Sequence, residues 1–82
     1  MLLRRRSRRW LTKTRRQLDQ ASLRSEEIVH IRVTGRDDDE RTQRSILTRR
    51  ACEEYGYMYA GLVAREGNAV VLRFTLRTDV IG

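Results

Sequence analysis

The segment YMYAGLVAREGNAVVLRFTLRT, residues 57–78, decides the fold because it joins two alternating stretches through a tight turn. In residues 69–78 every second side chain is apolar, which is typical of a strand with one buried face. The sequence Glu66-Gly67-Asn68 tolerates positive φ and therefore suits a short turn. The segment predicts a β-hairpin, and the apolar face of its second strand comprises Val70, Leu72, Phe74 and Leu76.

Upstream of the hairpin, the segment Ile28–Thr34 predicts a further strand. Its β-branched residues alternate so that Val29, Ile31 and Val33 share one face. The opposite face carries polar side chains beside Ile28. This pattern predicts a strand with a single fully apolar face.

A helix is predicted between these strands, after the acidic run Asp37–Glu40 and as far as Tyr55. An Asp at the N-cap accepts backbone N–H groups, and further acids in the first turn complement the helix dipole. Gly56 suits the left-handed residue that follows a helix. The predicted buried face of the helix comprises Ile46, Leu47, Ala51, Cys52 and Tyr55.

Together these elements predict an α+β fold. A basic N-terminal arm and helix occupy residues 1–25, and a β-α-β-β domain occupies residues 26–82. The helical crossover is expected to be right-handed, with the most apolar strand inserted antiparallel between the other two. The predicted sheet order is therefore 1-3-2 with the helix on one face, which is half of a ferredoxin-like sandwich.

The β-α-β-β order behind a basic segment resembles two known kinds of domain. One is the ACT-like cytosolic extension that follows the membrane helices of some transporter-associated proteins. The other is the bacterial cell-division topological specificity factor, which is loosely similar at Ile46-Leu47, Cys52 and Val70–Leu76. The membrane-targeting start of that factor is more apolar and less basic than Met1–Leu11. The first resemblance implies a regulatory or oligomerisation domain with the basic arm as a tail.

The net charge of +7 lies almost entirely in the first 25 residues. Nine basic residues accompany a single acid there, Asp19, whereas nine arginines face ten acids in the rest of the chain. This asymmetry indicates that a near-neutral body presents a basic arm to an anionic partner. The preference for Arg over Lys suits phosphate recognition, although a GC-rich genome would produce the same preference along the whole chain.

The basic arm supplies the candidate binding site. Its clustered arginines repel one another, and an anionic partner would relieve that repulsion and release counterions. Trp10 follows the cluster and could stack on a base, lie at a lipid headgroup boundary or pack the first helix onto the sheet. The candidate anion-binding residues are Arg4, Arg5, Arg6, Arg8, Arg9, Trp10, Lys13, Arg15 and Arg16.

A homodimer is also predicted, because the first strand has an open edge and the sheet face away from the helix is half apolar. The apolar residues predicted on that far face are Ile28, Tyr57, Tyr59, Val63 and Val71. The dimer would extend the sheet through this edge or stack the uncovered faces. In the alternative, the N-terminal helix folds back over the uncovered face through Trp10, Leu11 and Leu18, leaving a monomer. The expected interface comprises Ile28, Val29, His30, Ile31, Tyr57, Tyr59 and Val71.

Enzyme chemistry finds little support in the sequence. The lone His30 lies within a strand, and Cys52 lies on a helix face where a small buried residue is expected. The acidic run Asp37–Glu40 serves as a helix cap without a metal. We therefore predict no enzymatic activity, no cofactor and no metal. A single cysteine and the lack of a long apolar run predict a soluble protein of the reducing cytoplasm.

These observations favour a small accessory protein that engages the phosphates of DNA or RNA through its arginine-rich arm. One alternative is a module of the membrane surface, in which Leu2, Leu3, Trp10 and Leu11 insert while the arginines bind anionic lipid. Another is an ACT-like module that binds a protein partner. The nucleic-acid and membrane interpretations rely on the same basic residues and differ in how much they depend on apolar side chains.

Overall fold

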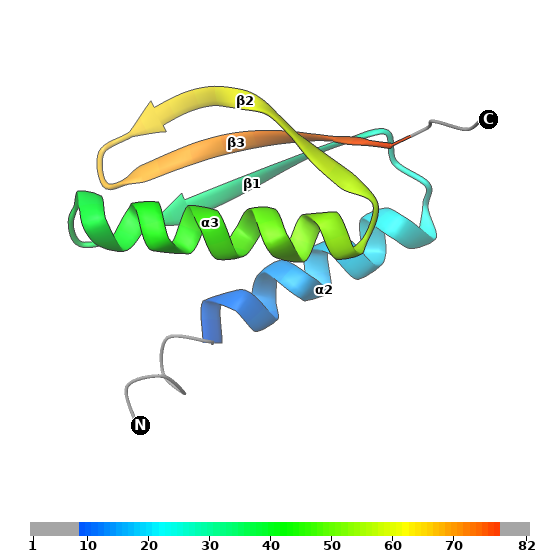
Figure 1. Ribbon diagram of the computed structural model, residues 1–82, viewed down its shortest axis with the longest axis horizontal. Helices are drawn as coiled ribbons and strands as arrows, with labels where there is room; N and C mark the ends of the chain where they lie inside the picture. The colour runs from blue at the N-terminus through cyan, green and yellow to red at the C-terminus, as the bar shows by residue number, and fades with distance from the viewer. Residues whose placement is uncertain (1–8, 78–82) are drawn as a thin grey trace.

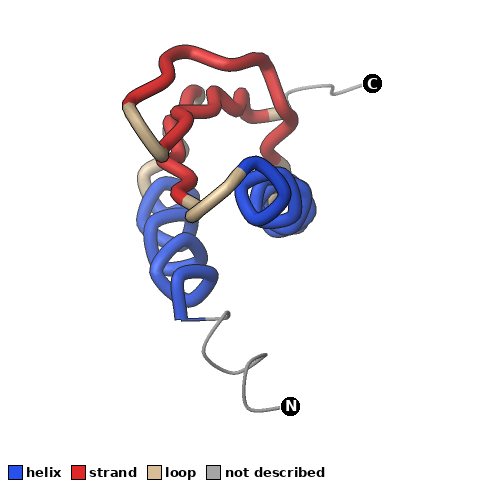
Figure 2. Tube along the Cα trace, turned by 90° about the vertical axis from the view of Figure 1, so that its left-hand side faces the viewer, coloured by secondary structure: helices blue, strands red, loops and turns tan. Residues whose placement is uncertain are grey.

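The computed structural model describes residues 9–77. In this range three strands form one antiparallel sheet in the order β1-β3-β2, and two helices lie on the same side of it (Figures 1 and 2). The α+β class and the sheet order 1-3-2 are therefore confirmed. The elements are α2 (Arg9–Leu23), β1 (Ile28–Thr34), α3 (Asp38–Glu54), β2 (Tyr57–Glu66) and β3 (Ala69–Leu76).

The core lies between the sheet and the two helices. Alternate residues of β1 are buried, as the β-branched pattern predicts, and in the register Ile31 pairs with Leu72 of the central strand. Phe74 is completely buried next to this pair. Tyr57 is also completely buried, and its hydroxyl donates to the Glu26 carbonyl at 2.6 Å, so its polar atom is satisfied.

Helix α3 begins at a cap that the sequence predicts. The N-cap residue Asp37 accepts the Glu40 N–H at 2.8 Å, and the Glu40 carboxylate accepts the Arg36 N–H at 2.8 Å. The first bond satisfies a backbone donor that a helix N-terminus leaves free, and the second ties the residue before the cap to the first turn. The backbone N–H hydrogen bond from Arg36 is the main reason that the pKa of Glu40 is lowered.

The buried face of α3 agrees with the prediction only in part. Ala51 and Cys52 are buried as expected, and Tyr55 is partly buried against the core, whereas Ile46 and Leu47 are exposed. Thr48 is also buried, and it was not predicted. The prediction was wrong for Ile46 and Leu47 because it followed the largest apolar side chains. Small side chains leave room for the helix backbone to approach the sheet closely, and they form the contact instead.

Strand β2 departs from simple alternation, because its register against β3 shifts at two places. Such shifts are β-bulges, which insert an extra residue and change the face of the residues that follow. As a result Tyr59, opposite Phe74, and Leu62, opposite Leu72, both face the helices. The prediction that Tyr57 and Tyr59 lie on the far face is therefore wrong. It assumed strict alternation along the strand, which would place Tyr59 and Leu62 on opposite faces of the sheet.

Helix α2 packs beside α3 and against β1. Leu18 is completely buried, and Leu11 is half-buried against the same core. Arg15 pairs with Glu54 of α3 at 2.9 Å, and the Tyr55 hydroxyl donates to the Asp19 carboxylate at 2.6 Å. The helix thus folds back, but onto the helix side of the sheet and not over the far face.

Candidate nucleic-acid interface

A groove runs between α2 and the outer edge of β1, with a volume of about 630 Å³. Because α2, β1 and α3 all contribute to it, it brings together residues that are far apart in the sequence. We call it the α2–β1 groove. Its walls comprise Trp10, Lys13, Thr14, Arg16, Gln17, Gln20, Arg32, Val33, Thr34 and Arg44.

Helix α2 supplies one wall through residues spaced three or four apart. Lys13, Gln17 and Gln20 recur with this spacing, which places them on one side of a helix. Gln17 fixes this wall to the sheet, because its Nε2 donates to the His30 carbonyl at 2.9 Å. The edge of β1 is therefore held by a side chain of α2 in place of a neighbouring strand.

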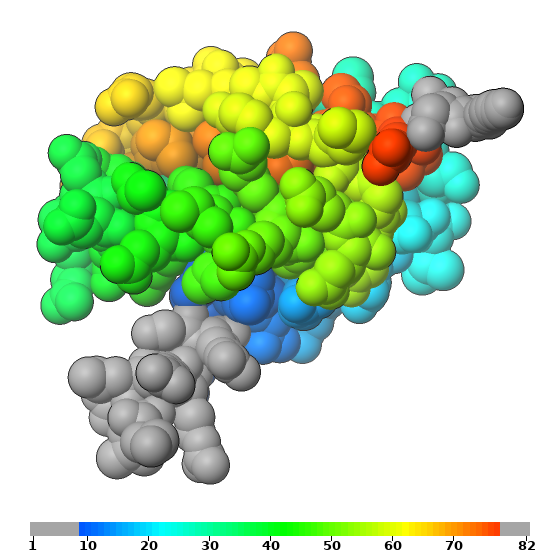
Figure 3. Space-filling model, in the orientation of Figure 1, coloured from blue at the N-terminus to red at the C-terminus, as the bar shows by residue number. Residues whose placement is uncertain are grey.

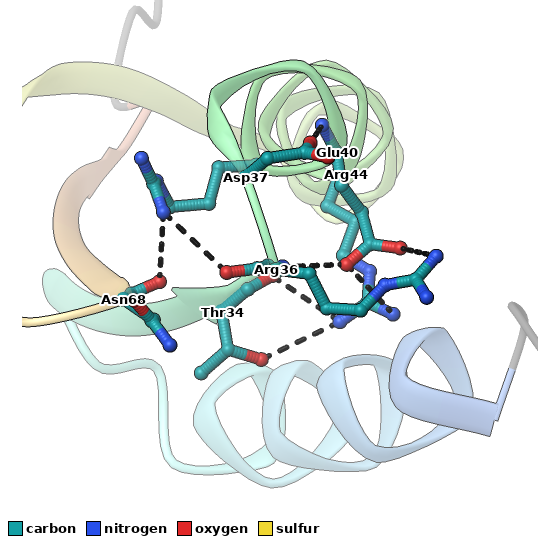
Figure 4. A network of polar contacts seen from close by, with 8 residues as sticks. Thr34, Arg36, Asp37, Glu40, Arg44 and Asn68 are labelled. Carbon is teal, nitrogen blue, oxygen red and sulfur yellow. Dashed lines mark hydrogen bonds and ion pairs between the residues drawn. The ribbon is translucent and has the colours of Figure 1, made fainter.

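Arg44 crosses the end of the groove. It reaches from α3 toward α2 (Figure 4), and its guanidinium donates to the Thr34 carbonyl at 3.2 Å. The same guanidinium lies 5.4 Å from the ring centre of Trp10, within the range of a cation–π contact. Arg44 thus lies between Trp10 and the end of β1, and the nearby Glu40 carboxylate offsets part of its charge.

A network of polar contacts holds this end in place (Figure 4). The carboxylate of Glu40 lies 4.0 Å from Arg44 and 3.6 Å from Arg36. On the other side of the helix start, Arg41 donates to the carbonyls of Gly35 and Asn68 at 3.4 and 3.5 Å. The network connects the end of β1, the start of α3 and the β2–β3 turn.

The groove is electropositive. Within residues 9–77 no acidic side chain lines it, and neither Lys13 nor Arg16 forms an ion pair with another described residue. Arg32 forms an ion pair with Glu66 at 3.3 Å on the open face of the sheet, and this pairing reduces the positive charge that Arg32 adds to the groove. Lys13 and Arg16 are consequently the cations that a phosphate could approach without first breaking an ion pair.

The structure separates the predicted binding residues into groups. Trp10, Lys13 and Arg16 line the groove, and Arg9 is exposed at the start of α2. Arg15 points the other way and pairs with Glu54, which raises the pKa of Arg15 through their hydrogen bond. Arg4, Arg5, Arg6 and Arg8 lie outside the described residues.

Sequence reasoning missed the part of the groove that the tertiary fold supplies. Gln17 and Gln20 carry no charge, so an electrostatic pattern does not reveal them. Arg32 and Arg44 lie outside the basic arm in sequence, among residues of nearly balanced charge. The regular spacing of Lys13, Gln17 and Gln20, which places them on one side of the predicted helix, was the sequence pattern that could have indicated this wall of the groove.

The residues expected at a dimer interface fall into a buried group and a more accessible group. Val29, Ile31 and Tyr57 are buried in the core, so their side chains are not available to a partner. On the open face of the sheet, Ile28 is exposed and His30 accepts from the Arg73 Nε–H at 3.3 Å. The other expected residues are Val71, half-buried in the central strand, and Tyr59, exposed on the helix side.

Other chemistry-bearing groups take structural positions. Cys52 is completely buried, and burial raises the pKa of its thiol to about 12, so it is held as an unreactive thiol. Among residues 9–77 no three His, Cys, Asp or Glu side chains gather as metal ligands would. Neither described helix has the length and apolar character that crossing a bilayer requires. No family model, curated protein or solved structure matches the chain.

Proposed function

We propose that this protein binds nucleic acid through the phosphates, with the α2–β1 groove as the structured part of the site and the N-terminal basic residues as its extension. The observation that supports the proposal most strongly is the acid-free wall of the groove. Lys13 and Arg16 project there without ion-pair partners among the described residues. Neutralising phosphates with such side chains releases condensed counterions, which drives binding.

Trp10 gives the groove a second way to hold a nucleic acid. Its ring lies at the end where the basic segment enters α2, and it is half-buried under Arg44. An aromatic ring beside a basic groove is the usual arrangement for single strands, whose bases stack while the phosphates follow the cations. We therefore favour a single strand over a duplex and expect little sequence preference.

A membrane surface is the competing partner, and the packing of α2 argues against it. An interfacial helix turns its apolar side chains outward toward the lipid. In α2, Leu18 is buried and Leu11 packs against the core, so insertion of either would require undocking the helix. The same positive charge is available to nucleic acid without that cost.

The test compares two variants of equal charge. Lys13→Gln with Arg16→Gln removes two cations from the groove, whereas Arg50→Gln with Arg65→Gln removes two exposed cations from other elements. Fluorescence anisotropy with a labelled single strand should show a plot of log K against log salt that is flatter by about 1.4 for the groove variant, since each lost phosphate contact removes about 0.7. The control should keep the wild-type slope.

Equal slopes for the two variants would refute the groove as the site. Binding to anionic vesicles but not to the labelled strand would refute nucleic acid in favour of a lipid surface. In that case the Trp10 emission should shift to the blue on vesicles, because the ring would leave water.

A further inference from the structure

The two edges of the sheet are finished differently. At the β1 edge, side chains of α2 and α3 donate hydrogen bonds to carbonyl groups that point away from the sheet. Gln17 donates to the His30 carbonyl, and Arg44 donates to the Thr34 carbonyl. At the other edge, no strand or helix of residues 9–77 lies beyond β2. An uncovered edge presents backbone N–H and C=O groups that can pair with another strand.

Exposed apolar side chains concentrate beside this uncovered edge. Eight large apolar side chains are exposed among the described residues, and five of them belong to β2 or to the part of α3 next to it. We call this region the α3–β2 flank. It comprises Ile46, Met58, Tyr59, Leu62 and Val63.

The flank is hollowed as well as apolar. A groove of about 560 Å³ opens between α3 and β2, and side chains of β3 are visible between the two elements in Figure 3. Val70 and Leu72 of β3 line its inner part, and Arg49 and Arg65 are among its charged residues. Arg49 lies 4.5 Å from the ring centre of Tyr59, so its charge is held against the protein's own aromatic ring.

We propose that a second copy of this chain covers the α3–β2 flank, with β2 pairing antiparallel to β2 of the partner about a two-fold axis. The residues of β2 are suited to such pairing, because positions 58–64 carry no charge. Around a two-fold axis each residue of this stretch meets another member of it, so no like charges are brought together. Arg65 and Glu66 lie at one end of the strand, away from the centre of the pairing.

The size of the flank suits a weak dimer. Helix α3 is about 25 Å long, and a helix with one adjoining strand is about 15 Å wide, so two flanks in contact cover about 750 Å² in total. Interfaces below about 1,200 Å² belong to weak complexes whose assembly depends on concentration. The bulges bend β2 and give it apolar side chains on both faces, since Tyr59 and Leu62 face the helices while Met58 pairs with Thr75 on the far side.

Sedimentation velocity of the full chain without nucleic acid tests the dimer. Across the micromolar range we expect the mass to rise with concentration from 9.7 kDa toward twice that value. Leu62→Asp should return the protein to a monomer at every concentration, because it places two carboxylates at the interface. Ile28→Asp is the matched control, since Ile28 is 52% and Leu62 47% exposed, and only Leu62 lies on the flank.

A mass of 9.7 kDa at all concentrations would overturn the proposal. It would do so even if the monomer were found to bind an unrelated acidic peptide on the flank. A dimer that survives Leu62→Asp but is lost with Ile28→Asp would move the interface to the β1 side and also overturn it. If circular dichroism shows that Leu62→Asp is unfolded, Val63→Asp takes its place. Since no nucleic acid is present, the result is independent of the proposed function.

Discussion

The two flanks of the sheet meet solvent in different ways. On the β1 side, α2 is anchored by a buried leucine, and an ion pair, Arg15–Glu54, joins it to α3. On the β2 side, the strand is bent by two bulges and leaves apolar side chains exposed around a groove. One small domain thus covers one edge of its sheet with its own basic helix and leaves the other edge of the sheet apolar and uncovered. We propose nucleic acid as the partner of the basic flank beside β1 and a second copy of the chain as the partner of the apolar flank beside β2.

The largest difference in stability between the two flanks is expected when one leucine on each flank is replaced by alanine. Leu18→Ala removes a completely buried side chain of α2 and should lower the free energy of unfolding by about 2–5 kcal/mol. Leu62→Ala removes a half-exposed side chain and should change it by less than about 1 kcal/mol in the monomer. Urea denaturation at low protein concentration measures both. Equal losses would mean that α2 is not docked as described.

The next largest effect is expected at the end of β1, where Gly35 meets the first turn of α3. A Cβ on Gly35 would lie 2.7 Å from the backbone nitrogen of Arg41, which a side-chain rotation cannot relieve. Gly35→Ala should therefore lower the free energy of unfolding by about 1–3 kcal/mol through overpacking. Gln43→Ala, an exposed position on α3, is the control. A neutral Gly35→Ala would show that α3 can shift without cost.

A smaller effect of opposite sign is expected in the contact between α3 and the sheet. The Thr48 hydroxyl is completely buried and has no hydrogen-bond partner among the described residues. Thr48→Val replaces the hydroxyl by a methyl group of similar size and should raise the free energy of unfolding by about 1 kcal/mol. Thermal and urea unfolding both measure this change. A loss of stability would mean that the hydroxyl is satisfied, for example by a buried water.

The smallest effect concerns the ion pair that holds α2 to α3. Hydrogen bonding to Arg15 lowers the pKa of Glu54, so the carboxylate is more stable in the folded state than in the unfolded chain. The stability it adds is present above the ordinary Glu pKa and is lost as the pH falls through the lowered pKa. Glu54→Gln should therefore be slightly less stable than wild type at neutral pH, and the two should converge in acid. A difference that does not depend on pH would exclude the ion pair as its cause.

Most of the fold was predictable because it depends on local patterns. The β-branched alternation of Ile28–Thr34 predicts β1 with its bounds, and the acids before α3 predict its cap. The faces of β2 were not predictable in the same way, because a bulge is set by pairing across strands. The buried face of α3 was predictable only in part: Ala51 and Cys52 were expected there, but Thr48 was not, because the close approach of the helix to the sheet favours small side chains over Ile46 and Leu47.

The candidate site was predictable only in part, for a similar reason. Charge density along the chain identifies Lys13 and Arg16, which are close together in sequence. It cannot identify Arg32 or Arg44, because only the tertiary fold brings their elements next to α2. It also cannot separate Arg15 from its neighbours, since the partner that occupies it, Glu54, lies in another helix.

The most direct test of the assignment of the two flanks is a backbone amide NMR titration of the full chain with a short single-stranded oligonucleotide. We expect the oligonucleotide to shift the amide signals of Gln17, Arg32 and Thr34, which belong to the α2–β1 groove, and to leave those of Ile46 and Leu62 unchanged. Dilution without oligonucleotide should shift the signals of Ile46 and Leu62 alone. Shifts at Ile46 and Leu62 on adding the oligonucleotide, with the groove signals unmoved, would contradict the account.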